Sequence, residues 1–138
     1  MRHPLARAAV LVFLALSAGC KSNDTTTTAP TTTTKTETFN GTVPVRSSDM
    51  HPFSVTASGQ VSVTLTAAGP PATIPMGVGI GTPADAACGI ITGGSVTAVA
   101  GTNAQLTGVV SPGTLCVLVF DVGNQTSAIT YTVTVSHP

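Results

Sequence analysis

Apolar and polar residues alternate along several stretches of this chain. Residues 60–67 read QVSVTLTA, so that valine and leucine alternate with serine and threonine. Residues 129–136, ITYTVTVS, show the same pattern near the C-terminal end. Successive side chains of a β-strand point to opposite faces, and this pattern therefore predicts strands with one face in a core and one in water.

Similar stretches occur elsewhere, separated by turns rich in glycine, proline and asparagine. They cover residues 36–43, 52–57, 76–80, 90–99 and 104–110. No helical period follows the first twenty residues. Seven or eight short strands, spaced about 8–12 residues apart, predict an all-β domain, a small antiparallel β-sandwich over residues 39–138.

One predicted strand breaks the alternation. Residues 114–121, TLCVLVFD, are apolar on both faces, with Cys116, Leu118 and Phe120 on the second face. A central strand covered on both sides, with the Cys88 segment across the second face, would explain this pattern. An exposed strip of Leu118 and Phe120 that binds a partner protein would also explain it. We favour the first interpretation.

The first twenty residues, MRHPLARAAVLVFLALSAGC, have the composition of a secretory signal. Arg2 and Arg7 precede an uncharged run at residues 8–19. A helix of that length spans about 18 Å, well short of the roughly 30 Å hydrocarbon layer of a membrane. We therefore predict a signal peptide at residues 1–19. A buried core helix is the alternative, disfavoured by the abrupt change to polar sequence that follows.

The end of this run, Leu16-Ser17-Ala18-Gly19-Cys20, resembles the lipobox of bacterial lipoproteins. The resemblance implies that Cys20 carries a diacylglycerol thioether, that the chain is cleaved before it, and that the new amino terminus is acylated. Several acyl chains anchor a protein firmly in a membrane. Lys21 stands where an inner-membrane retention signal would have aspartate. We therefore expect a lipid-anchored protein of the bacterial cell envelope, in the outer membrane, that faces the periplasm or the surface.

Residues 20–38 follow as a tether. After Cys20 the chain reads KSNDTTTTAPTTTTKTET, in which ten of eighteen residues are threonine. Such a segment has no apolar pattern that could offset the entropy of ordering it. We predict a flexible linker that lifts the domain away from the membrane and that could carry O-linked sugar.

Two cysteines remain if Cys20 carries lipid. An exported pair usually forms a disulfide, and we predict one between Cys88 and Cys116. A metal or redox pair is the alternative. Neither a Cys-x-x-Cys motif nor a close Cys–His spacing supports that alternative.

Charge is sparse in the predicted domain and limits its partners. Arg46, Asp49, Asp85 and Asp121 are the only charged residues of 39–138, with a formal net charge of −2. Binding to nucleic acid would need a basic face, so we expect no nucleic-acid partner.

The sequence contains no motif of a known catalytic site, and we predict no catalytic residue, no cofactor and no enzyme activity. A triad could draw on Ser47 or Ser48, Asp49 and His51. Residues adjacent in one turn rarely reach triad geometry, however, because its members usually come from separate segments.

A copper or zinc site is a further, less favoured possibility. Met50, His51 and His137 are suitable ligand types. We predict no metal site, because His51-Pro52 would open a strand and His137 would end one.

Residues 47–71, SSDMHPFSVTASGQVSVTLTAAGPP, and 111–138, SPGTLCVLVFDVGNQTSAITYTVTVSHP, together resemble the pre-peptidase C-terminal domain of exported bacterial proteins. The resemblance implies a jelly-roll-like sandwich that is non-catalytic and that assists secretion or binds polymers such as polysaccharide or collagen. We therefore expect an envelope lipoprotein with a module for binding or scaffolding. The alternative is an accessory subunit of an envelope or secretion complex that covers Leu118 and Phe120.

Overall fold

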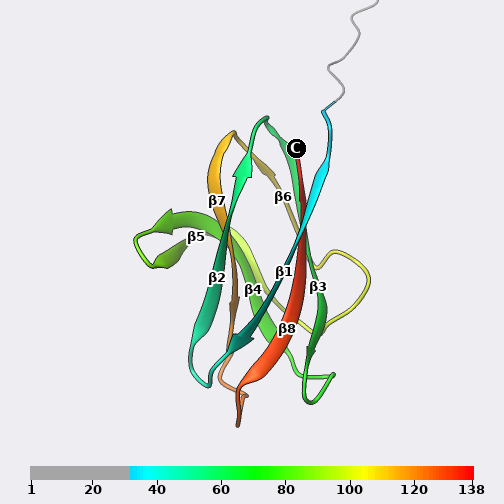
Figure 1. The fold of residues 1–138 in the computed structure, drawn as a ribbon, viewed down its shortest axis with the longest axis vertical. Helices are drawn as coiled ribbons and strands as arrows, with labels where there is room; N and C mark the ends of the chain where they lie inside the picture. The colour runs from blue at the N-terminus through cyan, green and yellow to red at the C-terminus, as the bar shows by residue number, and fades with distance from the viewer. Residues whose placement is uncertain (1–31) are drawn as a thin grey trace, which may run out of the picture. The chain divides into compact units, whose positions relative to one another are not determined.

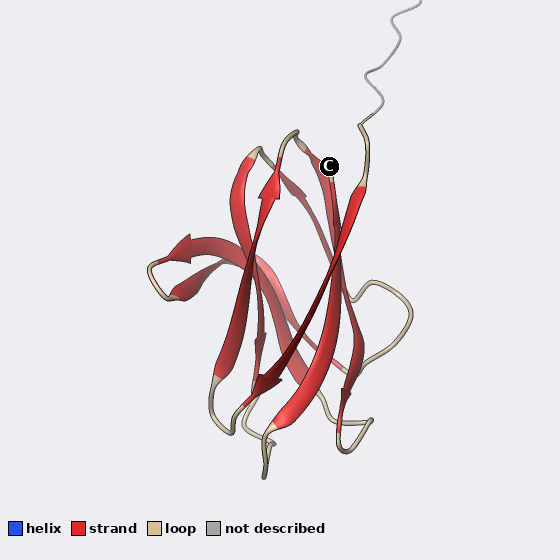
Figure 2. Ribbon diagram, viewed as in Figure 1, coloured by secondary structure: helices blue, strands red, loops and turns tan. Residues whose placement is uncertain are grey.

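The computed structural model describes residues 32–138, and its regular structure is made of β-strands (Figure 2). Within that range, no helix is long and apolar enough to cross a membrane. The strands are β1 (Lys35–Val43), β2 (Ser48–Val55), β3 (Gly59–Gly69), β4 (Met76–Ala84), β5 (Ala87–Ala98), β6 (Leu106–Val110), β7 (Gly113–Phe120) and β8 (Ile129–His137).

The eight strands form two antiparallel sheets that pack face to face (Figure 1). The first sheet has the order β1-β8-β3-β6, and the second has the order β2-β7-β4-β5. The pairs β1–β8, β2–β7, β3–β6 and β4–β5 are nested, as they would be if one long hairpin were rolled up on itself. This connectivity is that of a jelly roll, and the predicted fold class is confirmed.

The core is built from the inward positions of the alternating strands. On β8, for example, Tyr131, Val133 and Val135 are buried, while the threonines between them face outward. The core includes Val43, Phe53, Val55, Val61, Val63, Leu65, Ile74, Met76, Val78, Ile80, Leu106, Val110, Val117, Val119, Ile129, Tyr131, Val133 and Val135. The period of two in the sequence thus separates core from solvent, as predicted.

All the predicted strands are present, but several have different ends. β2 begins at Ser48, before the predicted start at residue 52, because Pro52 lies inside an edge strand that tolerates proline. β1 begins at Lys35 and so includes the last residues of the threonine-rich segment. The β4–β5 hairpin extends to Ala84 and Ala87, and its turn projects from the body of the sandwich (left in Figure 1).

Three glycines of β4 leave a trough on the outer face of the second sheet. Gly77, Gly79 and Gly81 alternate with the inward apolar residues of β4, and all three are buried. Phe120 lies over Gly77, and the side chain of Ile90 and the main chain of β5 lie over the other two. A Cβ atom at any of these positions would collide with its cover. The trough therefore allows β5 to close over the sheet.

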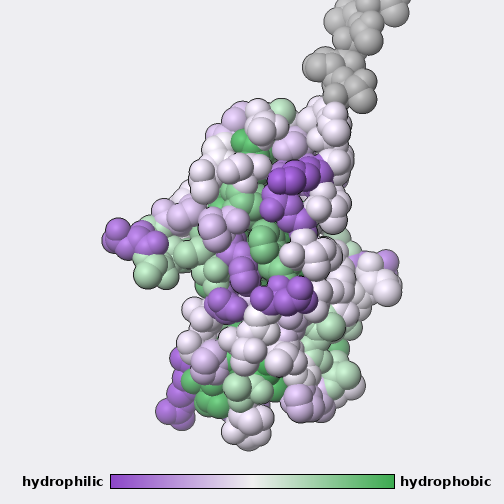
Figure 3. Space-filling model, viewed as in Figure 1, coloured by the Kyte–Doolittle hydropathy of each residue, from purple (hydrophilic) through white to green (hydrophobic). Residues whose placement is uncertain are grey.

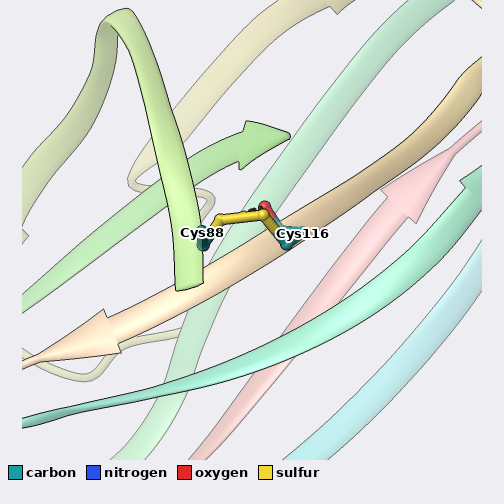
Figure 4. Close-up of a disulfide and its surroundings, with 2 residues drawn as sticks. All are labelled: Cys88 and Cys116. Atoms are coloured by element: carbon teal, nitrogen blue, oxygen red, sulfur yellow. Dashed lines mark hydrogen bonds between the residues drawn. A yellow bond between two sulfur atoms is a disulfide. The ribbon is translucent and has the colours of Figure 1, made fainter. Parts of the chain in front are cut away.

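A disulfide fixes this cover. Cys88, near the start of β5, is bonded to Cys116 on β7 (Figure 4), and the predicted pairing is confirmed. The two cysteines are 28 positions apart in the sequence. On the chain-entropy estimate, closing a loop of that length contributes about 3.5 kcal/mol to the free energy of unfolding.

At the end of the sandwich where β1 turns into β2, the carboxylate of Asp121 joins two loops. It accepts hydrogen bonds from the backbone N–H groups of Arg46 (2.7 Å), Gly123 (2.8 Å), Asn124 (3.2 Å) and Gln125 (3.3 Å). These bonds, with that from Arg46 the largest contribution, hold the pKa of Asp121 below its usual value of 3.8.

The trough leads to a prediction about Gly81→Ala. The new methyl group would meet the carbonyl oxygen of Gly89, a backbone atom that cannot swing aside. We expect a loss of about 2 kcal/mol in the free energy of unfolding, measured by urea denaturation, because overpacking costs roughly 1–3 kcal/mol. Gly89→Ala is the matched control, since its methyl would meet nothing closer than Thr82 O at 3.5 Å. If the two variants were equally stable, the close packing of β5 over Gly81 would be contradicted.

A second prediction concerns Asp121→Asn and pH. A carboxylate whose pKa is lowered by folding stabilises the fold at pH values above its usual pKa. This contribution is lost as the pH falls through the pKa of the carboxylate in the folded state. We expect D121N to be less stable than the wild-type protein at pH 7. The difference should narrow as the pH falls below 3.8, measured by thermal unfolding at each pH. A difference that stays constant with pH would argue against these hydrogen bonds.

Candidate functional site

The outer face of the first sheet is lined by hydroxyl groups, and none of the described residues places a charged side chain on it. Its outward residues on β1, β8 and β3, which we call the hydroxyl face, are Thr36, Thr38, Asn40, Thr42, Thr130, Thr132, Thr134, Ser136, Gln60, Ser62, Thr64 and Thr66. They lie in register across the strands: Thr38 and Thr64, for example, flank Thr134. Neighbouring strands lie about 4.7–4.9 Å apart, so the hydroxyl groups form rows at that spacing.

A shallow groove of about 720 Å³ crosses this face near the β3–β4 turn. It is lined by Asn40, Gly41 and Thr42 of β1, Thr130, Tyr131 and Thr132 of β8, and Ala67, Ala68, Gly69 and Pro70. Thr132 donates a hydrogen bond of 2.7 Å to Oδ1 of Asn40, and Thr130 donates one of 2.9 Å to the carbonyl of Gly69. The first bond orients the Asn40 amide and uses only its oxygen, so that its two N–H donors remain for a ligand.

The groove has the chemistry of a site for a neutral polar ligand. Hydroxyl and amide groups both donate and accept hydrogen bonds, as the hydroxyls of a sugar do. A charged ligand would find no opposite charge on this face to compensate for its lost hydration.

A second polar group of residues lies at the seam where the edge strands β1 and β2 meet. Tyr131 donates a hydrogen bond of 2.8 Å to Asp49, and His51 lies 2.8 Å from the same hydroxyl. Because the single phenol proton goes to Asp49, Nε2 of His51 is the donor in the second bond. Gly41 faces this group closely, and a Cβ atom there would collide with the Asp49 carboxylate.

The same seam continues toward the other end of the strands. Phe39 stacks on His51 with ring centroids 4.9 Å apart. Further along, Glu37 lies 2.7 Å from Lys35 and 3.1 Å from the buried ring of His137. The hydrogen bond from Lys35, and then that from His137, lower the pKa of Glu37. Figure 3 shows hydrophilic residues gathered where β1 and β2 lie in Figure 1.

This seam has a structural explanation. Burial, followed by the neighbouring Asp49 carboxylate, raises the pKa of Tyr131, so that its phenolate is disfavoured and cannot act as a base or nucleophile near neutral pH. Inward-pointing charged residues on edge strands also prevent those edges from pairing with other chains. Asp49 and Glu37 occupy such positions on β2 and β1.

The triad candidates are only partly brought together. Asp49 and His51 lie 3.7 Å apart, but their third partner is Tyr131 on β8. Ser47 and Ser48 are exposed, in the turn before β2 and at its start.

The suggested metal ligands also do not form a set. His51 contacts Tyr131, whereas His137 contacts Glu37 and the Phe53 ring. Between residues 32 and 138, no group of three or more histidine, cysteine or acidic side chains could hold a metal ion.

Leu118 and Phe120 are half-buried on the outer face of β7. β7 is a central strand between β2 and β4, and Cys116 on the same face is covered by the disulfide to Cys88. This arrangement fits our first interpretation of residues 114–121, in which the strand is covered on both sides.

The remaining predicted site residue, Cys20, lies outside the described residues, as does the signal peptide. Neither the groove nor the role of Tyr131 as the partner of Asp49 and His51 was predictable from the spacing of residues in the sequence. The alternation of serine and threonine with apolar residues on β3 and β8 was the available signal for the hydroxyl face. No model of a known protein family matches the chain, and no curated protein matches it.

Proposed function

We propose that this protein is a lipid-anchored lipoprotein of the bacterial envelope whose β-sandwich is a non-catalytic module that binds a neutral polymer, such as a polysaccharide. The groove across the hydroxyl face is the observation that carries the proposal. It offers uncharged side-chain donors and acceptors from β1 and β8, held in place by the sheet. Rigid strands position such groups more accurately than loops do.

The acidic side chains near the sandwich seams support a binding role over catalysis. Asp49 accepts a hydrogen bond from Tyr131, Asp121 accepts four from the backbone, and Glu37 is paired with Lys35. Each carboxylate is thus occupied within the fold. General acid–base catalysis by carboxylates usually needs a pair in different environments, one of them with a raised pKa.

Membrane attachment is the second part of the proposal. Its support is the resemblance of residues 16–20 to a lipobox and the threonine-rich segment that follows. We also propose that the sandwich is related to pre-peptidase C-terminal domains, some of which bind polymers. The alternative role, as an accessory subunit that docks through Leu118 and Phe120, has less support, since Phe120 already covers Gly77.

The anchor is tested by Cys20→Ala in a bacterial host. We expect the wild-type protein to incorporate radiolabelled palmitate and to sediment with membranes, and C20A to lose both properties, because its side chain has no thiol to alkylate. The double variant Cys88→Ala, Cys116→Ala is the control and should keep the label. An unlabelled wild-type protein would refute the anchor.

The groove is tested by Thr132→Val, assayed on chitin, cellulose and an array of neutral glycans. We expect the full chain to bind at least one of these probes, and T132V to bind it about tenfold more weakly, as the loss of one oriented hydrogen-bonding group would cause. Thr36→Val makes the same change on β1 outside the groove and should bind normally. Equal binding by both variants, or no binding to any glycan, would overturn the proposed role.

A further inference from the structure

The seam on the opposite side of the sandwich, between the edge strands β5 and β6, is open and apolar. A cleft of about 210 Å³ lies there, and its lining includes Val61, Ile80, Ile91, Leu106, Gly108 and Val110. Gly108 lies at the middle of β6, and a Cβ atom built on it would meet nothing within 4 Å. The cleft is thus the space that a larger residue at position 108 would fill.

Apolar side chains are exposed around this cleft. Val109 is 82% exposed and Ile91 41%. Neither a charged residue nor a histidine occurs between Asp85 and Asp121, a stretch that includes β5, β6 and β7. The β1–β2 seam, by contrast, is protected by charged residues.

β6 also has one free edge. Among the strands of residues 32–138, it is the last of the first sheet and pairs only with β3. Its outer edge therefore presents N–H and C=O groups that can accept another strand. Native edges are usually blocked by lysine, proline or an inward charge, and the sequence of β6, LTGVV, has none of these.

We propose that β6 pairs with β6 of a second copy of this chain, antiparallel and around a two-fold axis at Gly108. In that register Leu106 lies opposite Val110 of the second copy, and Thr107 lies opposite Val109. Gly108 lies opposite Gly108 of the second copy. Because glycine has no side chain, the two strands can approach each other closely at this position. A two-fold contact of this kind uses the same patch on both partners and closes on itself.

Charge favours a second copy as the occupant. The predicted domain has a net charge of −2, and its charged residues all lie outside the stretch that carries β6. Two identical chains therefore meet at β6 without like charges opposite each other, a pairing that would be destabilising. A charged strand from another protein would instead bury its charge against the apolar cleft, at a large cost in free energy.

The pairing joins the two first sheets into one sheet of eight strands. The hydroxyl faces of the two copies then continue on the same side of that sheet. The dimer does not depend on the proposed function, but it would present two grooves to one polymer and so raise the avidity of binding.

Sedimentation equilibrium of the full chain in a density-matched detergent tests the proposal. We expect the wild-type protein to have twice the chain mass. Val109→Lys should raise the dimer dissociation constant roughly tenfold, because it places a charge on each strand beside the axis. Val122→Lys makes the same change at an exposed valine away from β6 and should leave the dimer intact. A monomeric wild-type protein, or a V109K dimer as stable as that of V122K, would overturn the proposal.

Oxidative cross-linking provides an independent readout of the register. Gly108→Cys places one thiol of each copy on the axis, and we expect a disulfide-linked dimer on a non-reducing gel. Thr42→Cys, exposed on β1 at the far edge of the first sheet, is the matched control and should remain monomeric. No G108C cross-link, or equal cross-linking of both variants, would exclude pairing at β6.

Discussion

The pairing of β8 with both β1 and β3 is the interaction on which the rest of the sandwich depends. β8 joins the first strand of the fold to its third, and its last residue, His137, lies opposite Lys35. Because the strand pairs are nested, the outermost pair closes a loop of almost the whole domain. Such closure costs chain entropy, which burial of the inward valines and isoleucines must offset. The disulfide at Cys88 and Cys116 reduces that cost within the inner pairs.

Absence of side chains is as important to this fold as their presence. The outward glycines of β4 let β5 and Phe120 lie directly on the second sheet. Gly41 makes room for the carboxylate of Asp49 beneath β1, and Gly108 leaves the cleft beside β6. Glycine thus allows dense packing at the first two sites and leaves an open cleft at the third. The result depends on whether a neighbouring strand or side chain covers the glycine.

The two seams of the sandwich differ in a way that bears on function. Where β1 meets β2, the hydrogen bonds of Tyr131 with Asp49 and His51, together with Glu37, make a closed polar edge. Where β5 meets β6, the edge is uncharged and open. In the proposed dimer the open edge joins two copies, the closed edges lie outermost, and the uncharged hydroxyl face remains for a ligand. In a protein with so few charged residues, the position of these residues determines which sheet edge can pair with another chain.

The sequence by itself determined the fold class, the approximate number of strands and the disulfide, because a period of two and a pair of cysteines are local or pairwise signals. It also favoured an interpretation in which β7 is covered on both faces, since residues 115–120 are apolar at every inward and outward position. Only the tertiary structure decided that Asp49 and His51 meet Tyr131 rather than a serine, and that threonines of β1 and β8 line one groove. These contacts join strands that are far apart in the sequence, and a periodic pattern assigns a residue to a face without specifying its neighbours across the sheet.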